Sequence, residues 1–65
     1  MSNIKMYFYL KKLYWNSLLG MQYSIEEYQF DDAMYYYMSA LMHHDEVKEQ
    51  CLKLTSDERL ALYLF

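Results

Sequence analysis

The amino-acid sequence predicts an all-α fold, a small bundle of three or four helices in a single domain that spans residues 1–65. Three observations support this prediction. The chain has one glycine and no proline in 65 residues, which favours long helices over a many-turned β fold. Its hydrophobic content of 55% is too high for a disordered chain. Apolar residues also recur at helical spacing, and we expect helices near residues 3–19, 25–43, 46–54 and 57–64.

The first predicted helix covers residues 3–19 and ends at Gly20, because glycine suits the left-handed conformation of a C-terminal cap. Residues 20–23 then form a short connection. The alternation of apolar and polar residues over residues 3–11 also fits a strand, which the sequence leaves open. We favour the helix, since a lone strand would have no partner in this chain.

The central predicted helix, residues 25–43, begins after Ser24, which can cap free backbone N–H groups, with Glu27 at the reciprocal position of a capping box. One face of this helix carries apolar residues at the spacing of a core-facing helix. This predicted core stripe consists of Phe30, Ala33, Met34, Tyr37, Met38 and Leu41.

A second apolar stripe repeats every seven residues and contains Met21, Tyr28, Tyr35 and Met42. A 65-residue monomer buries only about 60% of the surface that its unfolded chain exposes, so its stability is marginal. One cysteine excludes an internal disulfide. We therefore expect the second stripe to be covered in a homodimer.

The C-terminal third contains two further predicted elements. We place a break near His44–Asp45, although the sequence leaves open whether residues 25–54 form one helix or two. Thr55 and Glu58 make another capping box at the start of the last helix. That helix is expected to present four apolar residues to the core, Leu60, Ala61, Leu64 and Phe65.

No catalytic, cofactor-binding or metal-binding residue is assigned. His43 and His44 are neighbours on a helix and point about 100° apart, so they cannot chelate one ion together. Cys51 lies on an apolar stripe, which predicts a buried, inert thiol. The acidic doublets at residues 26–27 and 31–32 are interpreted as solvated helix positions, because general acid–base catalysis needs carboxylates held in a cleft. The prediction is that the protein is not an enzyme.

The tyrosines favour a protein-interaction role. Nine tyrosines exceed the needs of a small core, and tyrosine is enriched at protein interfaces. The run Tyr35–Tyr36–Tyr37 spans 200° of a helix, so we expect Tyr37 in the core and Tyr36 against a partner. The predicted interface residues are Met21, Tyr28, Asp32, Tyr35, Tyr36 and Met42.

The expected function is a non-enzymatic regulatory module that binds a larger protein. A composition rich in Tyr, Met, Lys and Phe but poor in Ala, Gly, Pro and Arg indicates AT-rich coding, typical of a phage or mobile-element regulator or inhibitor of a host protein. The first alternative is nucleic-acid binding by the basic and aromatic first helix, through Lys5, Lys11, Lys12, Tyr9 and Trp15. A net charge of −3 disfavours it.

A second alternative places the first helix on a membrane surface. No stretch of the sequence is apolar enough for a membrane span. One cysteine and the lack of an export signal favour a cytoplasmic location.

Overall fold

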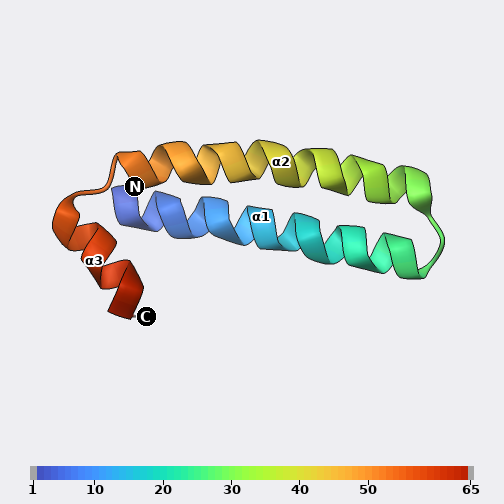
Figure 1. The fold of residues 1–65 in the computed structure, drawn as a ribbon, viewed down its shortest axis with the longest axis horizontal. Coiled ribbons are helices and arrows are strands. Elements are labelled where there is room, and N and C mark those ends of the chain that lie inside the picture. The colour runs from blue at the N-terminus through green and yellow to red at the C-terminus, as the bar shows by residue number, and fades with distance from the viewer. Residues whose placement is uncertain (1, 65) are drawn as a thin grey trace.

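The computed structural model describes residues 2–64, with side chains described as far as Leu62. Within residues 2–64 the chain forms three helices and no strand: α1 (Asn3–Glu26), α2 (Phe30–Leu52) and α3 (Ser56–Leu64). Helices α1 and α2 lie side by side as a long antiparallel hairpin, and the short α3 turns away beyond its open end (Figure 1). The all-α prediction is confirmed, and the strand alternative for residues 3–11 is wrong.

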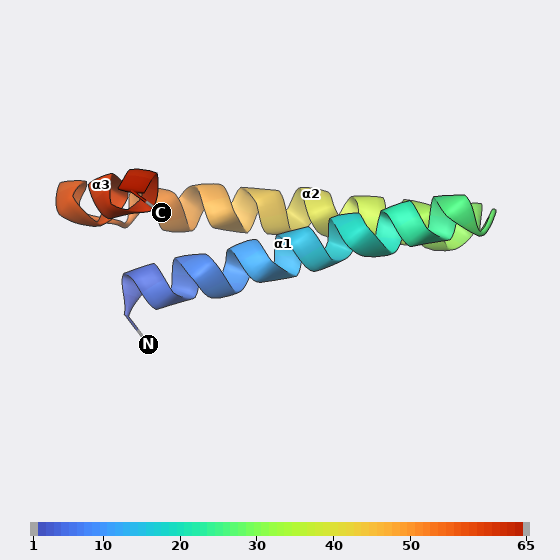
Figure 2. The ribbon, with the colours of Figure 1, turned by 90° about the horizontal axis from the view of Figure 1, so that it is seen from below.

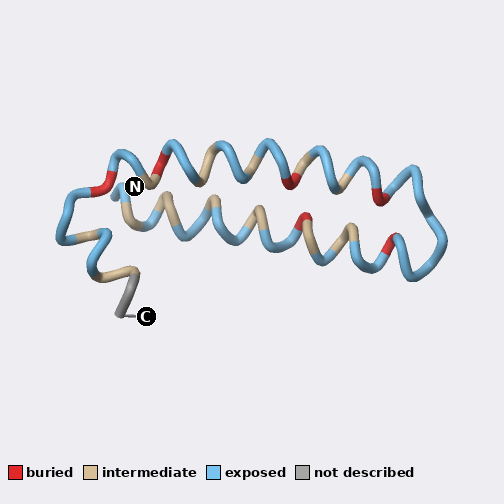
Figure 3. Tube along the Cα trace, viewed as in Figure 1, coloured by how far each residue is buried: buried red, intermediate tan, exposed pale blue. Residues whose placement is uncertain are grey.

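The two long helices meet along a seam whose residues alternate in steps of three and four. This spacing keeps one side of each helix facing the other over many turns, as in a coiled coil. All of these residues are buried or half-buried, and Figure 3 shows them on the facing sides of the two helices. The seam residues are Met6, Leu10, Leu13, Ser17, Gly20 and Ser24 of α1, and Ala33, Tyr36, Ala40, His43, Val47 and Gln50 of α2.

Small residues occupy the seam near the connection between the helices. Ser24, Ala33 and Ala40 are among the most buried residues of the chain. Gly20 faces the ring of Tyr36 so closely that a Cβ atom at residue 20 would lie 2.7 Å from the Tyr36 Cε1 atom. Towards the open end the seam contains larger side chains, and Figure 2 shows α1 diverging from α2 there.

The position of Gly20 corrects the prediction that the first helix ends there. Helix α1 continues through residues 20–23 to Glu26. Ser24 is therefore inside α1 and 2% exposed, and the capping box predicted for it with Glu27 is wrong. Glycine is favoured at position 20 because a Cβ atom there would clash with the Tyr36 ring unless the ring moved.

Helix α1 ends in a Schellman motif at residues 24–29. The backbone N–H of Gln29 donates to the carbonyl of Ser24 at 2.8 Å, and that of Tyr28 donates to Ile25 at 3.1 Å. These two bonds satisfy carbonyls that the helix end leaves unpaired. Tyr28 takes the left-handed position, with φ of 59°, which glycine usually occupies.

Helix α2 is continuous from Phe30 to Leu52, so the predicted break near His44–Asp45 is wrong, and residues 46–54 are not a separate helix. The seam explains this continuity, because His43 and Val47 follow the same spacing as the residues before them. At the open end Gln50 donates from Nε2 to the carbonyl of Asn3 at 2.9 Å. This bond ties the end of α2 to the beginning of α1.

Helix α3 begins with the predicted capping box. Glu58 N–H donates to Thr55 Oγ1 at 3.2 Å, and Thr55 N–H donates to Glu58 Oε1 at 2.9 Å. Arg59 donates from Nε and Nη2 to the carbonyl of Leu54 at 3.3 and 3.2 Å, which ties α3 to the connection that follows α2. Ala61 is half-buried, whereas Leu60 is exposed, contrary to prediction. The expected core roles of Leu64 and Phe65 fall outside the described side chains.

The predicted core stripe of the central helix is also wrong, apart from one residue. Ala33 is buried, but the five large members of the stripe are exposed: Phe30, Met34, Tyr37, Met38 and Leu41. The hairpin has a single layer of two helices, so each long helix buries only the side that faces the other. In α2 that side consists largely of small or polar residues, and the large apolar residues remain outside.

Candidate functional site

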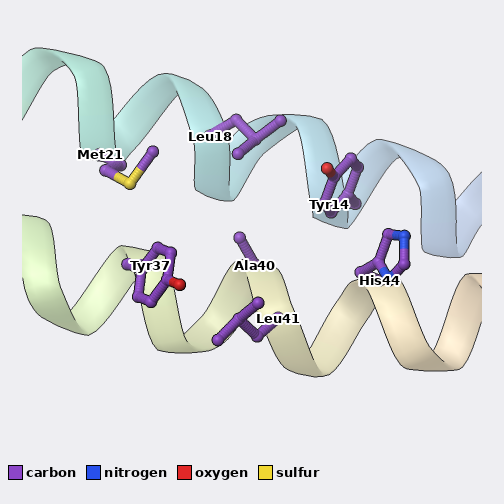
Figure 4. A pocket seen from close by; sticks show the side chains of 7 residues that line it. All are labelled: Tyr14, Leu18, Met21, Tyr37, Ala40, Leu41 and His44. Carbon is purple, nitrogen blue, oxygen red and sulfur yellow. The ribbon is translucent and has the colours of Figure 1, made fainter.

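Large side chains that follow a seam residue by one position form an apolar groove along one face of the hairpin. Successive helix residues are rotated by 100°, so each residue after a seam residue points to the same side of the hairpin. Figure 4 shows the middle of this groove, where Met21 lies opposite Tyr37 and Tyr14 lies opposite His44. The residues that line this middle section are Tyr14, Leu18, Met21, Tyr37, Ala40, Leu41 and His44.

The groove extends in both directions from this middle section. Towards the connection it shares Met21 and Tyr37 with a hollow that is also lined by Ile25, Phe30, Ala33 and Met34. Towards the open end it shares His44 with a hollow lined by Tyr7, Val47, Lys48, Cys51 and Leu52. A last hollow adds Lys11, Arg59 and Leu62. The groove therefore runs along both long helices from end to end.

Charge is distributed unevenly along the groove. Lys11, Lys48 and Arg59 all line its open end, where the Lys11 ammonium lies 5.5 Å from the centre of the Tyr7 ring. No acidic side chain lines the four hollows of the groove within the described residues. The acidic doublets at residues 26–27 and 31–32 are exposed around the connection, at the other end of the hairpin.

The two histidines lie on different faces, as expected for neighbours on a helix. His43 is in the seam, where its Nδ1 atom is buried, has no hydrogen-bond partner among the described residues and lies 3.7 Å from Glu46 Oε2. His44 lines the groove, with its ring centre 5.8 Å from that of Tyr14. In the described part of the chain, no three His, Cys, Asp or Glu residues are grouped so that they could hold a metal ion.

A second surface, here called the opposite face, is formed by residues that precede a seam residue by one position. It is mixed in character, because apolar side chains stand among lysines and acids. Its exposed large side chains are Tyr9, Leu19, Tyr23, Tyr35 and Met42. Its charged residues are Lys5, Lys12, Asp32, Glu46 and Glu49.

The structure divides the six predicted interface residues among four places. Met21 lines the groove, Tyr28 lies in the connection and Tyr36 lies in the seam. The other three residues are on the opposite face: Asp32, Tyr35 and Met42. The stripe at seven-residue spacing is thus not one surface, because Met21 belongs to a different helix from Tyr35 and Met42.

The expected burial of Tyr36 and Tyr37 is reversed in the structure. Tyr36 is half-buried against Gly20, and Tyr37 is 47% exposed at the groove. Sequence reasoning also missed Tyr14, Leu18 and Leu41 as groove residues. The alternating three- and four-residue spacing of small and apolar residues in both helices is the signal that could have identified them.

No known protein family matches this chain, and the chain is similar to no curated protein and to no solved structure. None of the three helices, over residues 2–64, has the length and apolar character needed to cross a membrane. The functional interpretation therefore depends on the two faces of the hairpin.

Proposed function

We propose that this chain is a non-enzymatic interaction module that acts by binding a larger protein through the opposite face of its hairpin. The observation that carries the proposal is the exposure of large apolar side chains. Sixteen of them are exposed among residues 2–62, five of them on the opposite face, whereas the buried apolar residues there are Ala33, Ala40 and Leu54. Exposed apolar surface on this scale is characteristic of proteins that bind other proteins.

The composition of the opposite face favours a partner that binds and dissociates. Such interfaces combine a few aromatic anchors with a polar rim, whereas permanent interfaces are more uniformly apolar. Tyr35 is a suitable anchor because it is 67% exposed and its ring packs edge-on against Tyr36, with ring centres 5.6 Å apart. A ring that is already held in place loses little conformational entropy when it binds.

The nucleic-acid alternative is weakened by the placement of the lysines. Lys11 lines the groove, whereas Lys5 and Lys12 belong to the opposite face, so the first helix does not present them as one patch. The same separation weakens the membrane-surface alternative. Titration with labelled DNA and RNA at low salt tests the nucleic-acid alternative. A nucleic-acid ligand would bind with an affinity that falls steeply as salt is added.

Capture of the partner from an extract of the source cells tests the proposed function. Tyr35→Ala should leave the helical content unchanged, because an exposed side chain contributes little to stability. It should reduce partner capture about 30-fold or more, since loss of an interface anchor costs ~2 kcal/mol or more of binding. Met38→Ala removes a similarly exposed side chain from another side of α2 and should capture the partner normally. Equal capture by both variants would exclude Tyr35 as an anchor and refute the proposed surface.

A further inference from the structure

The groove leaves both long helices with an uncovered apolar side. Each helix has two adjacent contact strips, one in the seam and an apolar one in the groove, and the hairpin covers only the first. Helices of four-helix bundles have this arrangement, because each of them packs against two neighbours. An occupant with two long helices of its own would cover such a face along its full length.

We propose that the groove is occupied by a second copy of this chain, laid antiparallel on the first, so that two hairpins form a four-helix bundle. This dimer uses the groove and leaves the opposite face accessible to the larger protein proposed above. The proposal thus concerns a different surface from the proposed function, and each can fail without the other.

The size of the groove face fits a dimer of this kind. The molecule measures 44 × 20 × 17 Å, and the hairpin presents its broad side when viewed down the shortest axis (Figure 1). The broad side of the whole molecule, α3 included, has a projected area of about 900 Å², so the hairpin alone presents somewhat less, near the ~800 Å² that each partner buries in a standard interface. Among the charged residues of α1 and α2, only Lys11 and Lys48 line the groove. Both are compatible with a buried interface, because long lysine stems can cover apolar surface while their ammonium groups stay in water.

Charge decides the orientation of the second copy. The half of the hairpin near the connection, residues 15–41, contains four acids and no base. All six basic residues, and the other five acids, are in the remaining part of the chain at the open end. A parallel dimer would place two acidic ends together, eight carboxylates in all. The antiparallel dimer places each acidic end beside the end of its partner that holds every base, which is the favourable arrangement.

Symmetry then fixes which residues meet. The two-fold axis of an antiparallel dimer crosses the hairpins at their midpoint, perpendicular to the helices, and a residue near this axis meets its own copy. Leu41 lies at the midpoint of α2 and lines the middle section of the groove. Leu41 of each copy therefore contacts Leu41 of the other.

Two adjacent residues of α2 provide a matched test. Leu41 lines the groove and is 51% exposed, whereas Met42 belongs to the opposite face and is 54% exposed. Substituting lysine at either position adds one positive charge to a half-exposed site, and Leu, Met and Lys have similar helix propensities. A difference between the two variants therefore reports the face on which the substitution lies.

Sedimentation equilibrium at tens of micromolar protein measures the outcome. The wild type and Met42→Lys should have about twice the chain mass of 8.1 kDa, and Leu41→Lys should be a monomer. A monomeric wild type would overturn the proposal and leave the groove for a different protein chain. A dimeric Leu41→Lys beside a monomeric Met42→Lys would move the dimer interface to the opposite face and overturn it equally.

Cross-linking keeps the test decisive if the Leu41→Lys monomer does not fold. In a Cys51→Ser background, Leu41→Cys should be joined to its own copy by a short bis-maleimide, because the two side chains meet at the axis. Met42→Cys should not be cross-linked under the same conditions. Equal cross-linking of the two variants, or none at position 41, would overturn the proposed packing.

Discussion

Replacing Gly20 with alanine should destabilise the protein, even though alanine is the better helix former. In the middle of a helix, Gly→Ala ordinarily stabilises by ~1 kcal/mol. Here the new Cβ atom would lie 2.7, 2.8 and 2.9 Å from the Cε1, Cδ1 and Cζ atoms of the Tyr36 ring. Carbon atoms in contact are normally separated by ~3.5–4.0 Å, so the ring must retreat by about 0.8 Å or more.

The ring has little freedom to retreat, because Tyr36 lies in the seam where Ser24 and Ala33 hold the two helices close together. Forcing extra atoms into a packed region costs ~1–3 kcal/mol. Over most of this range the cost exceeds the ~1 kcal/mol gain in helix propensity. We expect a net destabilisation of about 1 kcal/mol, or a melting temperature lower by about 4–8 °C for a chain of this size. Thermal unfolding followed by circular dichroism measures this change at one fixed protein concentration, because dimerisation would make stability depend on concentration.

A second background controls for the clash with Tyr36. When Tyr36→Ala removes the ring, Gly20→Ala should become stabilising by ~1 kcal/mol, the full gain in helix propensity. The two substitutions should therefore show a coupling energy of about 2 kcal/mol in a double-mutant cycle. Stabilisation by Gly20→Ala to the same extent in both backgrounds would refute the close packing of the seam.

Two further substitutions test the helix ends. Tyr28→Gly should raise the free energy of unfolding by about 0.5 kcal/mol, because the ~1–2 kcal/mol cost of a left-handed residue exceeds the ~0.5–1 kcal/mol entropic cost of glycine. The control substitution Tyr23→Gly, inside α1, should lower the free energy of unfolding. If urea unfolding showed a lower free energy for both variants, the left-handed assignment of Tyr28 would be contradicted. Thr55→Ala should cost ~1 kcal/mol through loss of the cap on α3, whereas Thr55→Ser should cost little. Hydrogen exchange of the Glu58 amide, which donates to the Thr55 hydroxyl, measures this effect, and unchanged protection in Thr55→Ala would count against the capping box.

Helical spacing predicted the all-α class and the capping box predicted the start of α3, but local signals could neither locate the end of α1 nor show that α2 is continuous. A glycine in a helical pattern is consistent with a C-terminal cap or with close packing against another helix. At Gly20 the packing of Tyr36, sixteen residues further along the chain, shows that the glycine serves close packing and not a C-terminal cap. The left-handed residue is Tyr28, where intrinsic backbone preference disfavours that conformation, so residue type does not mark the end of α1.

The prediction of the buried face of α2 failed for a related reason. A search for the most apolar stripe selects large residues such as Met34 and Leu41, which are exposed in the hairpin. The helices instead meet through Ala33 and Ala40, whose small side chains allow a close approach. Selecting the most apolar stripe therefore placed the predicted core about 100° away from the buried side of α2. It also exchanged the expected burial of Tyr36 and Tyr37. The proposed dimer would cover the groove residues of α2 with a second layer of helices.

The distance between two spin labels at the connection tests the antiparallel dimer most directly. The single label of a Glu27→Cys variant, in a Cys51→Ser background, would sit at an exposed position at one end of the hairpin. An antiparallel dimer places its two labels at opposite ends, separated by on the order of 35 Å, the length of a 24-residue helix. Double electron–electron resonance should show this distance at concentrations where the chain sediments as a dimer. Neighbouring helices pack only ~8–10 Å apart, so a parallel dimer would place the two connections side by side. A distance below about 20 Å between the labels would therefore contradict the antiparallel dimer.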